Sequence, residues 1–456
     1  MKKNLFAFLA LAALAAACTV NTESADDKID KGEPSVGFGA YINRGVTTKA
    51  GPAGELTTDS EGTVKLKETG FGVFCYYTAD GRYSYNAIPN FMYNEKVSYD
   101  TKYHVWTYFP IKYWPNQYDP TISDGVKDHL TFFAYAPYVP VTTSSGRVEG
   151  DADNGITSLS LNSSSGDPLV RYQASMDPTA CVDLCWGVSK NGLTASVDGF
   201  NNHVAKGAPY IDVLQLRKGD KIDFEFHHAL TALNVQIDAA VDAAMPGKEV
   251  DTATRVFVRA VTFEGFTTKG ALNLNSRVSD GPNWVDVQGF EGLNTDPVTI
   301  YDGRRNGKEG IEGVFASNEK TTGLNPLLVQ DRPYSDKNLA PGVTKTAVNL
   351  FNNKRLTVPV YVIPTGEPLK VTLVYDVETR DDKLATYLAD AETHGSSVDN
   401  SITKTIQIAG SDLTLEAGKK YTLVLHIGLT SVKFDASVSS WEQGTSGSAD
   451  MPQNNN

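Results

Sequence analysis

The chain has 456 residues, a length that allows two domains of ordinary size, each with its own hydrophobic core. Its formal net charge is −13, so its overall electrostatics disfavour nucleic acid as a partner, and we expect none. Four cysteines are too few to hold a chain of this length together, which excludes a fold maintained mainly by disulfides.

The N-terminus has the features of an export signal. Lys2 and Lys3 give it a positive start, and Leu5–Ala16 is an apolar run that is too short to cross a bilayer, which takes about 20 residues. Three alanines then precede Cys18. The arrangement resembles a bacterial lipoprotein signal, although the leucine lies one position further from the cysteine than is usual. We predict a signal peptide over residues 1–17 and a lipid anchor on Cys18, with an ordinary secretory signal as the alternative.

Strand signals dominate the rest of the chain. Residues 18–34 are polar and acidic and are expected to form a tether, after which Val36, Phe38, Ala40 and Ile42 recur at every second position, as in a half-buried strand. Further strand candidates follow at Phe71–Tyr77, Lys102–Phe109, Leu130–Tyr138, Lys221–Phe226, Leu233–Ile237, Arg255–Phe263, Leu356–Ile363, Leu369–Tyr375, Tyr421–Ile427 and Val432–Val438. This pattern predicts an all-β fold of two β-sandwich domains in tandem, over residues 35–245 and 246–456, with a polar tail.

Catalytic motifs are absent from the sequence. It contains no HExxH zinc motif, no GxSxG nucleophile turn and no P-loop, so we expect no enzyme activity and no cofactor. His227 and His228 are adjacent in a strand and must face opposite sides, which prevents them from jointly binding one metal ion. The segment 151–155 hints at a calcium loop, but Asn162 stands where a liganding glutamate is needed. We therefore predict no metal site.

Two groups of residues leave alternatives open. Cys181 and Cys185 fit buried thiols, a local disulfide or a metal site, in that order of preference. An aromatic cluster fits the core of a sandwich better than a sugar-stacking surface; its members are Trp106, Tyr108, Tyr113 and Trp114.

The strand segments, taken in order, resemble the fimbrillin family of Bacteroidetes, the pilins of cell-surface fimbriae. The resemblance rests on Ser35–Ile42 with the following Arg44–Lys49, Gly70–Phe74, Trp106–Pro115, Leu130–Pro137, Asp223–Leu230, Tyr421–Leu425 and Val432–Trp441. It implies two transthyretin-like β-sandwich domains, export as a lipoprotein of the cell outer membrane, and a cut after an arginine or lysine near the first strand. Loss of that strand would then open a slot for a strand from the next subunit.

The resemblance also suggests which residues take part in assembly. Arg44 directly follows the first apolar alternation and precedes Gly45, so cleavage is expected after Arg44, with Lys49 as a lesser candidate. The exchanged strand would then carry Val36, Phe38, Ala40 and Ile42. A possible donor strand is the late alternation of Val432, Phe434, Ala436 and Val438, because the tail that follows it has no such pattern.

The sequence thus favours a structural subunit of a fimbria, assembled by protease-triggered donor-strand exchange, with other pilin subunits and the outer membrane as partners. The alternative is a fimbrial-tip or surface-anchored adhesin that binds a glycan or host protein through its loops. A glycan-processing enzyme is a distant third reading, because no pair of catalytic carboxylates can be identified.

Overall fold

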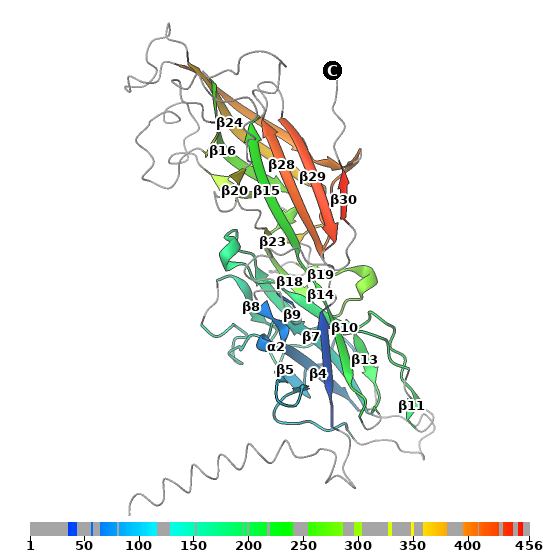
Figure 1. Ribbon diagram of the computed structural model, residues 1–456. Coiled ribbons are helices and arrows are strands. Elements are labelled where there is room, and N and C mark those ends of the chain that lie inside the picture. Colours follow the sequence, from blue (N-terminus) through cyan, green and yellow to red (C-terminus); the bar gives the residue numbers. More distant parts are fainter. Residues whose placement is uncertain are drawn as a thin grey trace, which may run out of the picture.

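In a computed structural model of the protein, the described residues form four main sheets arranged along an elongated molecule (Figure 1). The described residues are 35–42, 56–57, 64–79, 82–115, 128–150, 153–194, 196–197, 200–216, 219–239, 254–285, 296–302, 327–330, 348–350, 359–380, 395–408, 410–427, 432–440 and 446–449. Within them, no helix has the length and apolar character needed to cross a membrane. The prediction of an all-β fold is confirmed, and the transthyretin-like type of the sandwiches stays a prediction.

An eight-stranded sheet forms one end of the molecule, in the order β1-β14-β10-β7-β4-β5-β6, with β13 beside β7. Its strands are β1 (Phe38–Ile42), β4 (Phe71–Thr78), β5 (Met92–Asp100), β6 (Val105–Thr107), β7 (His129–Ala136), β10 (Cys185–Ser189), β13 (Tyr210–Val213) and β14 (Ile222–His228). The central strands β4 and β7 are almost continuously apolar because both of their faces are covered. In β4, Phe71 and Val73 face one buried cluster, whereas Phe74 and Tyr76 face another.

A four-stranded sheet, in the order β19-β18-β9-β8, contributes to the second of these clusters. Its strands are β8 (Gly155–Leu159), β9 (Leu169–Gln173), β18 (Lys269–Asn273) and β19 (Asn283–Val285). Tyr172 of β9 and Leu272 of β18 lie in the same buried cluster as Phe74 and Tyr76 of the larger sheet. The two sheets therefore share a core, as in a sandwich.

The other end of the molecule contains a seven-stranded and a five-stranded sheet (Figure 1). The seven-stranded sheet consists of β15 (Thr231–Ala239), β17 (Phe266–Thr267), β22 (Val348–Asn349), β23 (Val360–Pro364), β28 (Lys419–Ile427), β29 (Val432–Ser440) and β30 (Ser446–Ala449). The five-stranded sheet consists of β16 (Thr254–Glu264), β20 (Val298–Asp302), β21 (Leu327–Gln330), β24 (Lys370–Arg380) and β25 (Gly395–Thr405). Leu233 of β15 and Val261 of β16 lie in one buried cluster.

Each half of the chain contributes to a sheet that also contains strands of the other half. The expected domain boundary at 245/246 lies outside the described residues. A strand before it and a strand after it each pair with a strand of the opposite half of the chain. β15, which precedes it, pairs in parallel with β28 of the second half, and β18, which follows it, pairs with β9 of the first half. One continuous buried cluster consequently runs through both ends of the molecule. Such a shared core couples the two sandwiches mechanically, because neither can move without disturbing side chains of the other.

Short elements complete the described chain. They are the strand pairs β2 (Leu56–Thr57) with β3 (Val64–Lys65), β11 (Ser196–Val197) with β12 (Phe200–Asn201), and β26 (Gln407–Ile408) with β27 (Ser411–Asp412), the helix α2 (Leu66–Thr69), and the 3-10 helices η1 (Pro178–Ala180) and η2 (Val278–Asp280).

Candidate functional site

The first strand, β1, lies at an edge of the eight-stranded sheet. In the described part of the chain its ladder partner is β14, with which it runs parallel from Phe38 opposite Ile222 to Ile42 opposite Phe226. An edge strand held by one ladder can leave a sheet without breaking a second ladder. The position of β1 is therefore suited to strand exchange.

Alternate side chains of this segment are buried, as its sequence alternation predicts. The exposed fractions are 2% for Val36, 1% for Phe38, 6% for Ala40 and 7% for Ile42. All four lie in the cluster on one face of the eight-stranded sheet. Full burial of a valine, isoleucine or phenylalanine side chain contributes about 1.5–3 kcal/mol, so the segment is held mainly by its apolar side chains.

Phe38 forms the centre of an aromatic group. Its ring centroid lies 5.3 Å from that of Tyr108, 6.0 Å from Phe132, 6.2 Å from Phe224 and 6.3 Å from Phe71. Three of these contacts are edge-to-face, an arrangement that aromatic rings favour. Removing β1 would uncover these four rings together, and they would form the floor of an apolar slot.

The residues that precede β1 are fixed by hydrogen bonds rather than by a ladder. The Val36 amide donates to the Lys112 carbonyl over 2.9 Å, and the buried Tyr108 hydroxyl donates to the Val36 carbonyl over 2.9 Å. Burial raises the pKa of Tyr108, so its hydroxyl keeps its proton and remains a donor. The Lys112 carbonyl lies 3.2 Å from the same hydroxyl and would remain as its acceptor after the segment has left.

The opposite face of β1 carries Gly39 and Tyr41. Gly39 lies against the carboxylate of Asp223, with which a Cβ at that position would collide. Tyr41 is 41% exposed and lies under the Lys190 ammonium, 3.0 Å from the ring centroid. Burial raises the pKa of the Asp223 carboxyl, and the nearby Lys190 and Lys221 oppose that shift. A side chain larger than glycine at this position would therefore have to displace the Asp223 carboxylate.

The expected donor strand is part of the opposite end of the molecule. β29 contains Val432, Phe434, Ala436 and Val438 and lies between β28 and the edge strand β30 (Figure 1). Nine residue pairs join it to β28. Ala436 is buried, and Val438 packs against the shared core. In the monomer, this strand is thus an integral member of its own sheet.

The residues expected to direct export and cleavage cannot be placed. The signal peptide 1–17, the lipid-anchored Cys18, the cleavage pair Arg44 and Gly45, and Lys49 all lie outside the described residues, as do Asp151 and Ala152 of the suspected calcium loop. Their roles stay predictions.

Most of the aromatic cluster lies in the core, which is the interpretation that the sequence favoured over a sugar-stacking surface. Trp114 and Tyr108 are 1% and 6% exposed, and the Trp106 ring lies 5.2 Å from that of Phe71. Tyr113 is the exception, with 47% of its surface exposed. It lies beside the start of the first strand segment, where it forms a bridge with Ser35.

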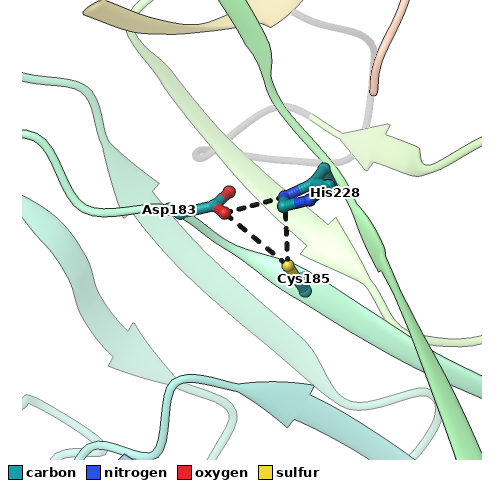
Figure 2. A group of neighbouring side chains, drawn as sticks. All are labelled: Asp183, Cys185 and His228. Carbon is teal, nitrogen blue, oxygen red and sulfur yellow. Dashed lines mark hydrogen bonds and ion pairs between the residues drawn. The ribbon is translucent and has the colours of Figure 1, made fainter. Parts of the chain in front are cut away.

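Sequence reasoning missed one group of polar side chains. Asp183, Cys185 and His228 converge in the core of the molecule (Figure 2). Their side chains come from the segment before β10, the first residue of β10 and the last residue of β14. His227 faces the other way, with its ring 5.6 Å from that of Trp186, so the two histidines do point to opposite sides. Because Asp183 and His228 are far apart in sequence, only the pairing of β10 with β14 brings them together.

The three cysteines of the described chain are all buried free thiols, so Cys181 and Cys185 do not form a disulfide here. Burial raises the pKa of Cys181 to about 11, and it raises that of Cys75 well above its ordinary value. Thiols in this state are poor nucleophiles, because the thiolate is the reactive form.

Comparison with known proteins identifies the family. The model of the fimbrillin-like family matches residues 57–441, which is most of the chain. A fimbrial protein from Bacteroides vulgatus has 19% sequence identity and a TM-score of 0.49, over 89% of this chain and 99% of that one. The tip fimbrial protein of Porphyromonas gingivalis, truncated at its C-terminus, has 10% identity and a TM-score of 0.23, over 82% of this chain and 95% of that one. No curated protein matches. On the strength of the family match, the chain belongs to the fimbrillin-like family, a membership that supports a role as a fimbrial subunit at the cell surface.

Proposed function

We propose that the protein is a structural subunit of a cell-surface fimbria that polymerises by exchange of its first strand. The precursor is exported as a lipoprotein and held on the outer membrane through Cys18. A protease cuts after Arg44, the leader leaves together with β1 and the lipid, and a strand from another subunit fills the slot. Adhesion by the resulting fibre is the biological outcome.

The observation that supports this most directly is the combination of edge position and deep burial in β1. A single ladder to β14 makes the strand removable, whereas four buried side chains make its loss costly. Val36, Phe38 and Ile42 alone contribute about 5–9 kcal/mol of apolar burial before ordering costs. A vacated slot would therefore bind a matching strand strongly, and this gain in free energy would drive polymerisation.

The slot also defines its occupant. The incoming strand needs apolar side chains at four alternate positions, in place of Val36, Phe38, Ala40 and Ile42. It needs a small residue where Gly39 meets Asp223. These two requirements restrict which side chains fit the slot, whereas the backbone hydrogen bonds could be made by any extended segment.

Near the C-terminus, β29 carries the alternation that a donor needs, through Val432, Phe434, Ala436 and Val438. Donation would require its ladder of nine pairs with β28 to open first. The subunit is therefore expected to accept a strand more readily than it gives one. Such a subunit fits one end of a fibre.

The experiment is cleavage of the purified full chain with an arginine-specific protease, followed by mass spectrometry and electron microscopy. We expect a new N-terminus at Gly45, a released leader that contains β1, and fibres or strand-linked oligomers. Arg44→Ala is the matched control, because it removes the expected cut and leaves the other arginines in place. Efficient cleavage after Arg44 and dissociation of the leader, with a product that neither assembles nor takes up a synthetic peptide of residues 35–42, would refute strand exchange.

A second function is favoured by exposed aromatic side chains. Tyr85 and Phe109 are 80% and 76% exposed, and Tyr113 is 47% exposed beside the first strand segment. Exposed aromatic rings can stack on the apolar faces of sugars, as a tip or surface-anchored adhesin would require. Glycan-array binding by the uncut monomer, lost in a Phe109→Ala, Tyr113→Ala double variant, would support this function. No binding by the uncut monomer would count against it.

A further inference from the structure

Asp183, Cys185 and His228 form a buried group in the first half of the chain, just beyond the end of the ladder between β1 and β14. We propose that these three residues bind a structural zinc ion. The Cys185 and His228 residues are direct partners in the antiparallel ladder between β10 and β14, and Asp183 lies two residues before Cys185. Figure 2 shows the carboxylate, the thiol and the imidazole pointing toward one another.

The distances among the three ligand atoms suit one small cation. The Asp183 Oδ2 lies 2.7 Å from the His228 Nδ1 and 3.9 Å from the Cys185 Sγ, and the Sγ lies 3.5 Å from that Nδ1. A point equidistant from the three atoms lies about 2.0 Å from each, close to zinc–ligand distances of about 2.0–2.3 Å. A cation slightly out of their plane would reach all three without movement of the backbone.

The ligand types select zinc among the common divalent ions. A thiolate and an imidazole are the ligands that zinc prefers, and a carboxylate completes sets of this kind. Calcium and magnesium take oxygen ligands and are disfavoured by the sulfur. The thiolate and the carboxylate carry two negative charges together, and a dication cancels them, which a buried site requires. Coordination by both carboxylate oxygens of Asp183 would fill a fourth position.

The hydrogen bonding of the group is crowded without a cation. One oxygen of Asp183, Oδ2, faces both neighbours: it lies 2.7 Å from Nδ1 of His228 and 3.9 Å from the thiol of Cys185. All three side chains are at most 1% exposed, so bulk solvent does not reach them. A central cation would instead contact the three atoms at once.

The surrounding backbone holds the ligands in place. The Ala229 amide donates to the Leu184 carbonyl over 2.8 Å, and the Trp284 indole donates to the Ala229 carbonyl over 2.9 Å. Thr231, two residues further on, begins the strand that joins the second sandwich. Zinc here would fasten the segment before β10 to the end of β14, at the place where the chain passes between the sandwiches. Its role would be structural, because its buried position leaves no room for a substrate.

The test is direct metal analysis of the full chain, extracted in detergent and dialysed against metal-free buffer. We expect one zinc ion per chain, retained until the protein is unfolded in denaturant. Cys185→Ala is expected to lose this zinc, whereas Cys181→Ala is the matched control, since it removes another buried thiol of the same region and should retain the metal. Zinc at well under one ion per chain in the wild type, or equal zinc in both variants, would overturn the proposal.

A second measurement keeps the test decisive if Cys185→Ala does not fold. The wild-type chain is unfolded, stripped of metal and refolded with cobalt(II), which replaces zinc in tetrahedral sites and is coloured. We expect a sulfur-to-cobalt charge-transfer band in the near ultraviolet together with visible bands of tetrahedral cobalt. A refolded chain that binds cobalt without the charge-transfer band, or binds none, would show that Cys185 ligates no metal.

Discussion

Replacement of Phe38 by alanine tests whether β1 is held by its buried side chains. The ring is 1% exposed and has four aromatic neighbours at centroid distances of 5.3–6.3 Å. These neighbours belong to a packed cluster that can collapse only partly into the space left, so the substitution should cost about 3–5 kcal/mol. Since β1 is an edge strand, most of this cost should appear as easier release of β1 rather than as global unfolding.

Hydrogen exchange provides the assay. The Ile222 amide donates to the Gly37 carbonyl over 2.9 Å, so it is protected only while the segment before β1 is in place. A loss of about 3–5 kcal/mol corresponds to exchange at this amide that is faster by roughly a hundredfold or more. Tyr41→Ala is the matched control, because Tyr41 lies on the exposed side of the same strand and its contact with Lys190 is worth about 0.5–1 kcal/mol.

Two outcomes would contradict this role of the Phe38 ring. If Phe38→Ala accelerated exchange at Ile222 no more than Tyr41→Ala, the apolar side chains would not be what holds β1. If Phe38→Ala accelerated exchange equally at Ile222 and at the central strand β7, the substitution would act through global unfolding, and β1 would not be a separately removable element.

Three further predictions follow from the same region and from the thiols. Gly39→Val should lower the free energy of unfolding of the precursor by about 1–3 kcal/mol, and with it the thermal midpoint, because the new side chain collides with Asp223. An unchanged midpoint would show that the Asp223 side chain moves aside without cost. Burial raises the pKa of the Asp223 carboxyl, which lies against Gly39, above its ordinary value of 3.8. The state with β1 in place therefore binds the carboxyl proton more tightly than the state without it. We expect β1 to be retained best below pH 3.8 and to be released more readily as the pH rises through the raised pKa. Exchange at Ile222 measured across this range should show the trend, and Asp223→Asn should flatten it. The buried thiols Cys75 and Cys181 should resist alkylation in the native protein and react fully in denaturant, as mass spectrometry would detect; rapid labelling of either in the native state would contradict their burial.

Much of the fold could be predicted from the sequence because the signals are local. Alternation at Val36, Phe38, Ala40 and Ile42 reflects the two-residue period of a strand, and the burial of these side chains agrees with it. The opposite orientations of His227 and His228 follow from the same period. The aromatic runs of β4 and β7 could likewise be assigned to strands, since such residues suit a buried sheet.

Pairing over long distances could not be predicted in the same way. The sequence places β15 in the first half of the chain and β18 in the second, yet each strand is hydrogen-bonded to a strand of the other half. Periodicity shows which face of a strand is buried, but it contains no information about which strand lies alongside. For this reason the sequence offers no signal that β15 pairs with β28 or that β18 pairs with β9.

The all-β class, the apolar face of β1 and the family resemblance follow from the amino-acid sequence alone, because each depends on residue order within short segments. Folding makes β1 an edge strand on a single ladder, places Gly39 against Asp223, and brings Asp183, Cys185 and His228 together in the core. These three facts concern residues that are distant along the chain and become neighbours only when the sheet forms. The features on which the proposed strand exchange and the proposed zinc binding depend are therefore features of the assembled sheet.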